Sequence, residues 1–272
     1  MSVIFSWRED HLDALLRSCE RDEARAIVAR HFLPGSHLLE AGCGAGRWVR
    51  YLTDYGYRVV GLEYSHETVA MVKKAWPDLE VVRGNCEASP FGDGEFDGVL
   101  SFGVVEHWKE GPRKPLQDIF RVLKPGGKAL ITVPCFNEVR RLKRLVWWDE
   151  ITQSPRALLA WVVKGKVKPL SRVYGKGLYR VFPAWGEFFE YRMSVSEFAR
   201  EVAAVGFRVL EHSPLGGMDG IYHELNPVGC LVGWEEWRFE PTRLALLMNR
   251  ILARSPFFHS HMQAIVAEKP LV

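Results

Sequence analysis

The chain has few cysteines, and they show none of the spacings typical of zinc sites or disulfide frameworks. Its five cysteines are scattered through 272 residues without a C-x-x-C pair. No apolar run approaches the ~18 residues that a membrane-spanning helix needs. The first residues lack the basic and apolar layout of a signal peptide, and there are no internal repeats. These absences favour a cytoplasmic globular protein with reduced cysteines.

Length and hydrophobic content fit one large domain with an insertion. The chain is long enough to bury a full core, and its hydrophobic fraction of 47% is ordinary for a globular protein. From Leu38 to Pro134, strand-like apolar runs alternate with helix-like segments. This alternation predicts an α/β fold with a parallel sheet, helices on both faces, and ligands beyond the carboxyl ends of the strands.

The most informative stretch is a strand that breaks into a glycine-rich turn and continues as a helix. Gly42, Gly44 and Gly46 follow the apolar run at 38–41, and a helix is predicted from 47 to 55. Glycine has no Cβ, so a ligand can approach the bare backbone of such a turn. The free N–H groups of the following helix point to the same crevice, so we expect polar ligand groups there.

A second apolar strand, predicted at 58–62, ends in Glu63, 21 residues after Gly42. A βαβ nucleotide-binding unit places at this distance the carboxylate that accepts hydrogen bonds from ribose hydroxyls. The dinucleotide fingerprint G-x-G-x-x-G requires a third glycine where this chain has Arg47. A NAD-dependent oxidoreductase is therefore an alternative that Arg47 disfavours.

Four segments together resemble the class I S-adenosylmethionine-dependent methyltransferases. They are the glycine turn, the segment 81–91, the strand 95–102 with the following Glu106-His107 pair, and the helix, turn and strand at 121–131. The resemblance is nearest to small-molecule methyltransferases that include quinone-biosynthesis enzymes. It implies a Rossmann-like, seven-stranded, mostly parallel sheet with an inserted cap after the fifth strand. A non-catalytic S-adenosylmethionine-binding protein is a further alternative.

The resemblance also implies S-adenosylmethionine as the cofactor and a set of residues that contact it: Glu40, Gly42, Cys43, Gly44, Gly46, Glu63, Tyr64, Asn85, Cys86, Glu87, Ser101 and Phe102. The glycines would approach the methionine part, Glu63 the ribose, and Asn85 the adenine, with Ser101 and Phe102 lining the channel toward the methyl group. The family commonly has an aspartate where this chain has Asn85. The amide carbonyl still offers an acceptor for the adenine amine.

Two histidines are candidates for a general base in methyl transfer to a hydroxyl oxygen, the favoured target among oxygen, nitrogen and carbon acceptors. His107 follows the fourth predicted strand at the pocket mouth, and His223 lies among aromatic residues. Histidine is the usual base near neutral pH, although positioning alone supplies much of the rate. The structural alternative is that both side chains only shape or pack the site. We expect no metal site.

We predict four regions: a helical cover at 1–35, the cofactor-binding core at 36–135, a basic cap at 136–190, and a C-terminal completion of the sheet at 191–272. The last region includes a helix capped by Ser194 and Glu197, a final antiparallel strand at 262–267, and a second cap segment at 216–260. Residues 136–185 hold eleven Lys or Arg against three acids. Such a run of charge is often only a solvated face, but its mixture with aromatic residues favours an acidic or lipid-linked acceptor and leaves peripheral membrane contact open. A net charge of only +3 for the chain disfavours nucleic acid.

Overall fold

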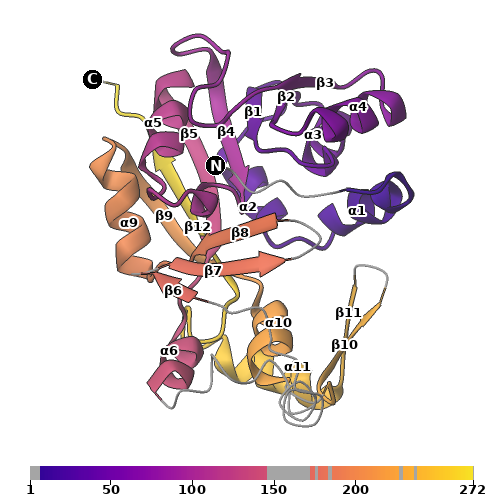
Figure 1. Cartoon of the computed structure of the whole chain (residues 1–272), viewed down its shortest axis with the longest axis vertical. Coiled ribbons are helices and arrows are strands. Elements are labelled where there is room, and N and C mark those ends of the chain that lie inside the picture. Colours follow the sequence, from indigo (N-terminus) through magenta and orange to yellow (C-terminus); the bar gives the residue numbers. More distant parts are fainter. Residues whose placement is uncertain are drawn as a thin grey trace.

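The computed structural model describes residues 7–145, 172–174, 177–182, 186–226, 229–235 and 238–271. Its centre is a seven-stranded sheet in the order β3-β2-β1-β4-β5-β12-β9 (Figure 1). The strands are β1 (His37–Ala41), β2 (Arg58–Glu63), β3 (Glu80–Arg83), β4 (Phe96–Phe102), β5 (Leu123–Pro134), β9 (Arg208–Leu215) and β12 (Met262–Glu268). β1 to β5 pair in parallel, and β12 runs antiparallel to both β5 and β9. The predicted fold class is confirmed.

Helices cover both faces of the sheet because successive strand residues point to opposite sides. Leu38 joins the core packed against α2 (Ala24–His31), α3 (Arg47–Asp54) and α4 (His66–Ala75). Its neighbour Leu39 joins the core packed against α5 (Arg113–Val122) and α9 (Val195–Ala204). α1 (Leu12–Cys19), which follows the short turn η1 (Glu9–His11), lies against α3.

Helix boundaries follow the local signals in the sequence. Ser194 and Glu197 form the predicted capping box at the start of α9. α5 ends at Val122, and Lys124, the residue before Pro125, lies in β5. Proline disfavours helical geometry in the residue before it. The Lys124 ammonium instead pairs with Asp97 at 2.6 Å.

The remaining elements lie after β4 and β5 and between β9 and β12. They are η2 (Val105–His107), α6 (Glu138–Leu145), β6 (Arg172–Tyr174), β7 (Gly177–Phe182), β8 (Gly186–Tyr191), α10 (Gly217–Gly220), η3 (Ile221–Leu225), β10 (Val232–Glu235), β11 (Arg238–Pro241) and α11 (Arg243–Leu252). β6, β7 and β8 form an antiparallel sheet, and β10 pairs with β11. Much of the predicted cap at 136–190 lies outside the described residues.

Two chain segments far apart in the sequence meet at the end of the molecule away from the central sheet. Figure 1 shows α6 at the same end as α10, α11 and the β10–β11 hairpin. The guanidinium of Arg140 in α6 donates to Glu224 in η3 at 2.6 Å, and both side chains are buried. A charged pair that is buried needs such direct pairing, so it fixes η3 relative to α6.

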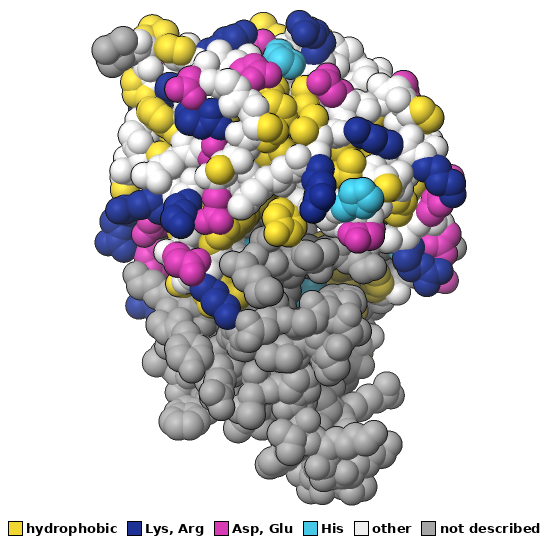
Figure 2. All heavy atoms as spheres, turned by 45° about the horizontal axis from the view of Figure 1, so that its top comes forward, with side chains coloured by type: hydrophobic (Ala, Val, Ile, Leu, Met, Phe, Trp, Pro, Cys, Tyr) yellow, Lys and Arg dark blue, Asp and Glu magenta, His cyan; other side chains and the backbone are white. Residues whose placement is uncertain are grey.

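The surface of the described part carries mixed charge. On the face drawn in Figure 2, basic and acidic side chains are interspersed over the coloured area. Among the helices of the described residues, none is both long and apolar enough to cross a membrane.

Candidate active site

A cavity of about 240 Å³ lies beyond the carboxyl ends of β1, β2 and β4. We call it the donor cavity. Its lining is Trp7, Gly42, Gly44, Glu63, Tyr64, Asn85, Cys86, Phe102, Gly103, Val104, His107 and Trp108. Most of these residues are ones that the sequence predicted. The parallel strands bring their carboxyl ends to one edge of the sheet, which explains why residues from separate motifs meet there.

The glycine turn presents bare backbone to the donor cavity. Gly42 has a φ of +79° and Gly44 a φ of +52°, in the left-handed region that favours glycine. A Cβ on Gly42 would lie 2.7 Å from a Val104 methyl carbon, and a Cβ on Gly44 would lie 3.0 Å from the Trp7 ring. Only glycine fits at both positions while leaving room for a ligand.

The carboxylate of Glu63 is held in place by the backbone around it. One oxygen accepts from the N–H of Gly44 at 3.0 Å, and the other accepts from the N–H of Ser65 at 2.8 Å. Each carboxylate oxygen has a further lone pair for a ligand hydroxyl. This bare loop beside a fixed carboxylate suits the amino-acid tail and ribose of S-adenosylmethionine.

Asn85 and Cys86 line the donor cavity, but Glu87 does not. The side-chain oxygen of Asn85 accepts from the N–H of Glu87 at 3.0 Å and closes a local turn. This bond uses the oxygen of the Asn85 amide, and the two N–H groups of the same amide can donate to a ligand. The carboxylate of Glu87 lies 3.9 Å from the ammonium of Lys114.

Four other predicted cofactor residues stand behind the cavity wall. Glu40 is buried, and burial, opposed by the nearby Arg47 charge, raises its pKa to about 8. Cys43 packs against Gly61: a Cβ added to Gly61 would lie 2.8 Å from the Cys43 sulfur. Gly46 precedes α3 as its N-cap with a positive φ, and Ser101 is fully buried. None of the four lines the donor cavity.

His107 lines the donor cavity with a neutral ring. Its Nδ1 lies 2.7 Å from the carbonyl oxygen of Phe189, which only accepts, so Nδ1 carries the proton. Burial lowers the pKa of His107. Burial also raises the pKa of the adjacent Glu106 well above its usual range, and an oxygen of this carboxyl lies 3.8 Å from Nε2 of His107.

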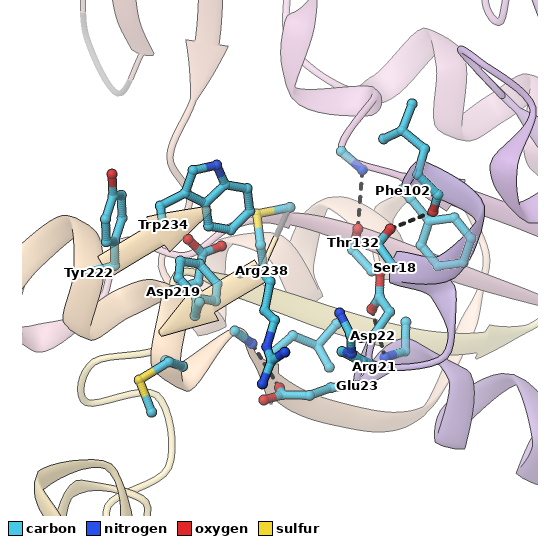
Figure 3. A pocket seen from close by; sticks show the side chains of 18 of the residues that line it. Ser18, Arg21, Asp22, Glu23, Phe102, Thr132, Asp219, Tyr222, Trp234 and Arg238 are labelled. Atoms are coloured by element: carbon cyan, nitrogen blue, oxygen red, sulfur yellow. Dashed lines mark hydrogen bonds between the residues drawn. The ribbon is translucent and has the colours of Figure 1, made fainter. Parts of the chain in front are cut away.

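A second, larger cavity of about 870 Å³ adjoins the first. We call it the acceptor cavity, and Figure 3 shows side chains that line it. Trp7, Phe102 and Gly103 line both cavities. The rest of the wall comes mainly from three parts of the chain: the end of α1 with the α1–α2 connection, the central sheet, and described residues between 215 and 241. Among its residues are Ser18, Arg21, Asp22, Glu23, Thr132, Asp219, Tyr222, His223, Trp234, Arg238 and Phe239.

His223 lines the acceptor cavity and is oriented by Asp219. Its Nε2 lies 3.1 Å from a carboxylate oxygen of Asp219. Burial opposes ionisation of Asp219, but the hydrogen bond from His223 and nearby positive charge lower its pKa. The ionised carboxylate accepts from Nε2–H, which leaves the lone pair on Nδ1. The two predicted histidines therefore line different cavities.

Asp219, His223 and His261 could offer three metal ligand atoms within 4.8 Å of one another. The surroundings of His261 disfavour it as a metal ligand. Nδ1 of His261 lies 2.7 Å from the guanidinium of Arg140, which only donates, so the neutral ring carries its proton on Nε2. Burial and the Arg140 charge lower the pKa of His261 to about 4. This cluster is better suited to hydrogen bonding than to binding a cation.

The acidic groups of the acceptor cavity have partners within the protein, and two of its arginines do not. Asp22 pairs with Arg47 at 2.9 Å, and Glu23 accepts from the N–H of Gly216 at 2.8 Å. Arg21 and Arg238 form no ion pair with another described residue. Two positive charges are thus available to a ligand. The sequence pointed to neither arginine, because charged residues at a loop and a hairpin usually face only solvent.

Residues 39–131 match the model of a family described as "Methyltransferase domain". The chain is 38% identical over 105 residues to a protein of Mycolicibacterium smegmatis named "Probable S-adenosylmethionine-dependent methyltransferase", covering 38% of this chain and 40% of that protein. It is 29% identical over 189 residues to the demethylmenaquinone methyltransferase of Renibacterium salmoninarum, covering 68% and 72%. The match thus covers less than half of the length of the Mycolicibacterium protein and 72% of the length of the Renibacterium protein.

The fold is similar to that of a solved S-adenosylmethionine-dependent methyltransferase from Methanosarcina mazei. The TM-score is 0.57 at 17% identity, with 90% of this chain and 98% of the other covered. A likeness at this identity supports the fold alone. The family match, in contrast, spans the strands and loops that build the donor cavity.

Proposed function

We propose that this chain is a class I S-adenosylmethionine-dependent methyltransferase that methylates a hydroxyl oxygen of a small acceptor molecule, since residues 39–131 match the model of a methyltransferase domain. The observation that carries the proposal is the Glu63 carboxylate, fixed by the Gly44 and Ser65 N–H groups at the wall of the donor cavity. In this role Glu63 accepts from the ribose hydroxyls. Gly42 and Gly44 contact the amino-acid tail, and Tyr64, Asn85 and Cys86 surround the adenine.

When bound, S-adenosylmethionine supplies an electrophilic methyl group that passes to the acceptor oxygen as its bond to sulfur breaks. The chain mainly has to hold the acceptor in line and exclude water. Phe102, Gly103 and Trp7 line both cavities, so the reacting atoms meet at this shared wall.

In this proposal His223 is the general base for the acceptor hydroxyl. Asp219 holds the ring by its Nε2–H and stabilises the positive charge that develops when Nδ1 takes the proton. His107 has another role: it lines the donor cavity and bonds Phe189 of β8, which positions that strand over the cavity. Its side chain then shapes the site rather than moving a proton.

The acceptor cavity favours an acceptor with an acidic group and an apolar body. Arg21 and Arg238 supply charges that suit a carboxylate or a phosphate. Tyr222, Trp234 and Phe239 supply an aromatic wall (Figure 3 labels Tyr222 and Trp234). A lipid-linked acid meets both conditions.

Calorimetric titration with S-adenosylhomocysteine tests the cofactor, with NAD as the competing ligand. We expect S-adenosylhomocysteine to bind and NAD to give no heat of binding. Binding of NAD alone would assign the chain to the nicotinamide oxidoreductases. Incorporation of labelled methyl into candidate acidic acceptors then separates an enzyme from a protein that only binds the cofactor.

Two histidine variants test the base. His223→Gln keeps a donor for Asp219 but removes Nδ1, so we expect kcat to fall about 100-fold. The acidic limb of the pH profile of kcat/KM should disappear with it. His107→Asn keeps a donor near the Phe189 carbonyl and should retain that limb. The opposite pattern would make His107 the base and overturn this assignment.

A further inference from the structure

α11 exposes an apolar stripe on its outer face. Thr242 caps the helix by accepting from the N–H of Ala245. On the inner face Ala245 is fully buried, and Met248 packs with Ile221 and Val232. On the outer face lie Leu244, Leu247 and Ile251, at spacings of three and four residues, and each is more than half exposed, at 56%, 53% and 52%. Leu246, at 52%, is exposed as well.

The charged residues of this helix are all basic. α11 contains Arg243 and Arg250, Arg254 follows just after its end, and residues 243–254 include no acidic residue. The three arginines fall along one edge of the leucine stripe at the helical period. None of them pairs with another residue in the part of the chain that the structure describes. The face drawn in Figure 2, in contrast, mixes both signs of charge.

An apolar stripe beside a row of cations is the pattern of a helix that lies in the interface of a membrane. The leucines enter the boundary between head groups and acyl chains while the arginines meet anionic head groups. A water-exposed helix of a globular protein usually carries charged residues across its outer face, so this stripe calls for a partner. A partner with a negative surface and an apolar layer under it matches both features.

The helix also follows directly on a part of the acceptor-cavity wall. The β10–β11 hairpin leads directly into α11, and it contributes Trp234, Arg238 and Phe239 to the cavity wall. Trp234 is 46% exposed, and tryptophan is enriched at membrane interfaces. A bilayer against α11 would therefore lie beside the hairpin that forms part of the cavity wall.

We propose that α11 docks the protein on the surface of an anionic lipid bilayer through Leu244, Leu247 and Ile251, with Arg243, Arg250 and Arg254 on the head groups. This docking does not depend on the proposed methyl transfer. It brings the acceptor cavity to the membrane, where an amphiphilic acceptor is concentrated.

Co-sedimentation of the full chain with vesicles tests the proposal. We compare vesicles of phosphatidylcholine alone with vesicles of phosphatidylcholine mixed with phosphatidylglycerol. We expect binding to the anionic vesicles only, and weaker binding as salt rises. Each change of Arg250 or Arg254 to Gln should reduce the partition coefficient about fivefold. Equal binding to both vesicles, or binding to neither, would overturn the proposal.

The double variant Leu247→Asp, Ile251→Asp should abolish sedimentation with anionic vesicles. Leu33→Asp is the matched control, because Leu33 is a leucine that is 75% exposed and lies outside α11. Circular dichroism melting and S-adenosylhomocysteine titration check that each variant is folded. If the double variant still sediments like the control, α11 does not dock. If light scattering shows that it only abolishes self-association, the stripe is a contact between copies and the proposal is wrong.

Discussion

The carboxylate of Glu63 accepts a hydrogen bond from the backbone N–H of Gly44, with 3.0 Å between nitrogen and oxygen. The end of β2 and the glycine turn after β1 are thus joined before any ligand enters. A site arranged in this way needs little reordering when it binds, which favours affinity.

Glu63→Gln should weaken S-adenosylhomocysteine binding about 10- to 100-fold. The reason is that hydrogen bonds to a charged group contribute about 1.5–3 kcal/mol, and glutamine keeps the shape without the charge. Calorimetric titration measures the change. Glu80→Gln, at an exposed position of β3 beside β2, is the control and should keep the wild-type Kd. Equal affinities for the two variants would remove Glu63 from the donor site.

Trp7→Ala should raise the Kd of S-adenosylhomocysteine about tenfold, because the indole covers Gly44 and lines both cavities. Trp234→Ala is the matched tryptophan variant and lines the acceptor cavity alone. It should leave the Kd of S-adenosylhomocysteine unchanged. A normal Kd in the Trp7 variant would show that the N-terminal segment does not contribute to the donor site.

Glu40→Gln should stabilise the protein increasingly as the pH rises from about 5 to 8. Burial raises the pKa of Glu40 to about 8, so the folded state holds a proton that the unfolded state releases above about 4.5. The wild-type protein therefore takes up a proton when it folds, and its free energy of unfolding falls as the pH rises. This fall levels off above about pH 8. Thermal melts of both proteins across this range measure the difference. A difference that stays constant with pH would contradict the shifted pKa.

Arg140→Met should lower the free energy of unfolding by about 3–5 kcal/mol, because it removes the guanidinium that pairs with the buried Glu224 carboxylate. Arg141→Met is the adjacent control. The guanidinium of Arg141 is exposed and lies 3.5 Å from Glu138, so its loss should cost less than about 1 kcal/mol. Urea unfolding measures both values. Similar small losses would mean that the Arg140–Glu224 pair does not hold the two segments together.

The donor cavity was largely predictable from the sequence because its signals are local. The glycine turn, the residue that ends β2 and the turn after β3 are each read within a few positions, and the parallel sheet brings them together. Local signals did not reveal side-chain direction. Glu40 and Glu63 both lie at strand ends, yet Glu63 lines the cavity and Glu40 is buried behind it.

The acceptor cavity was not predictable in the same way, because its wall is built from segments far apart in the chain. Arg21 and Arg238 belong to different regions and meet only through tertiary packing. His223 stood out in the sequence, but its relation to His261 depends on the contact of their rings, whose centres are 4.5 Å apart. No periodicity of residues encodes such a contact.

The buried Arg140–Glu224 pair has a consequence for protein engineering. A chimera that takes residues 136–190 from a relative would import one half of a charge pair whose counter-ion stays with the host. An exchange of acceptor preference between relatives must therefore move residues 216–226 in the same graft, or replace both members of the pair at once.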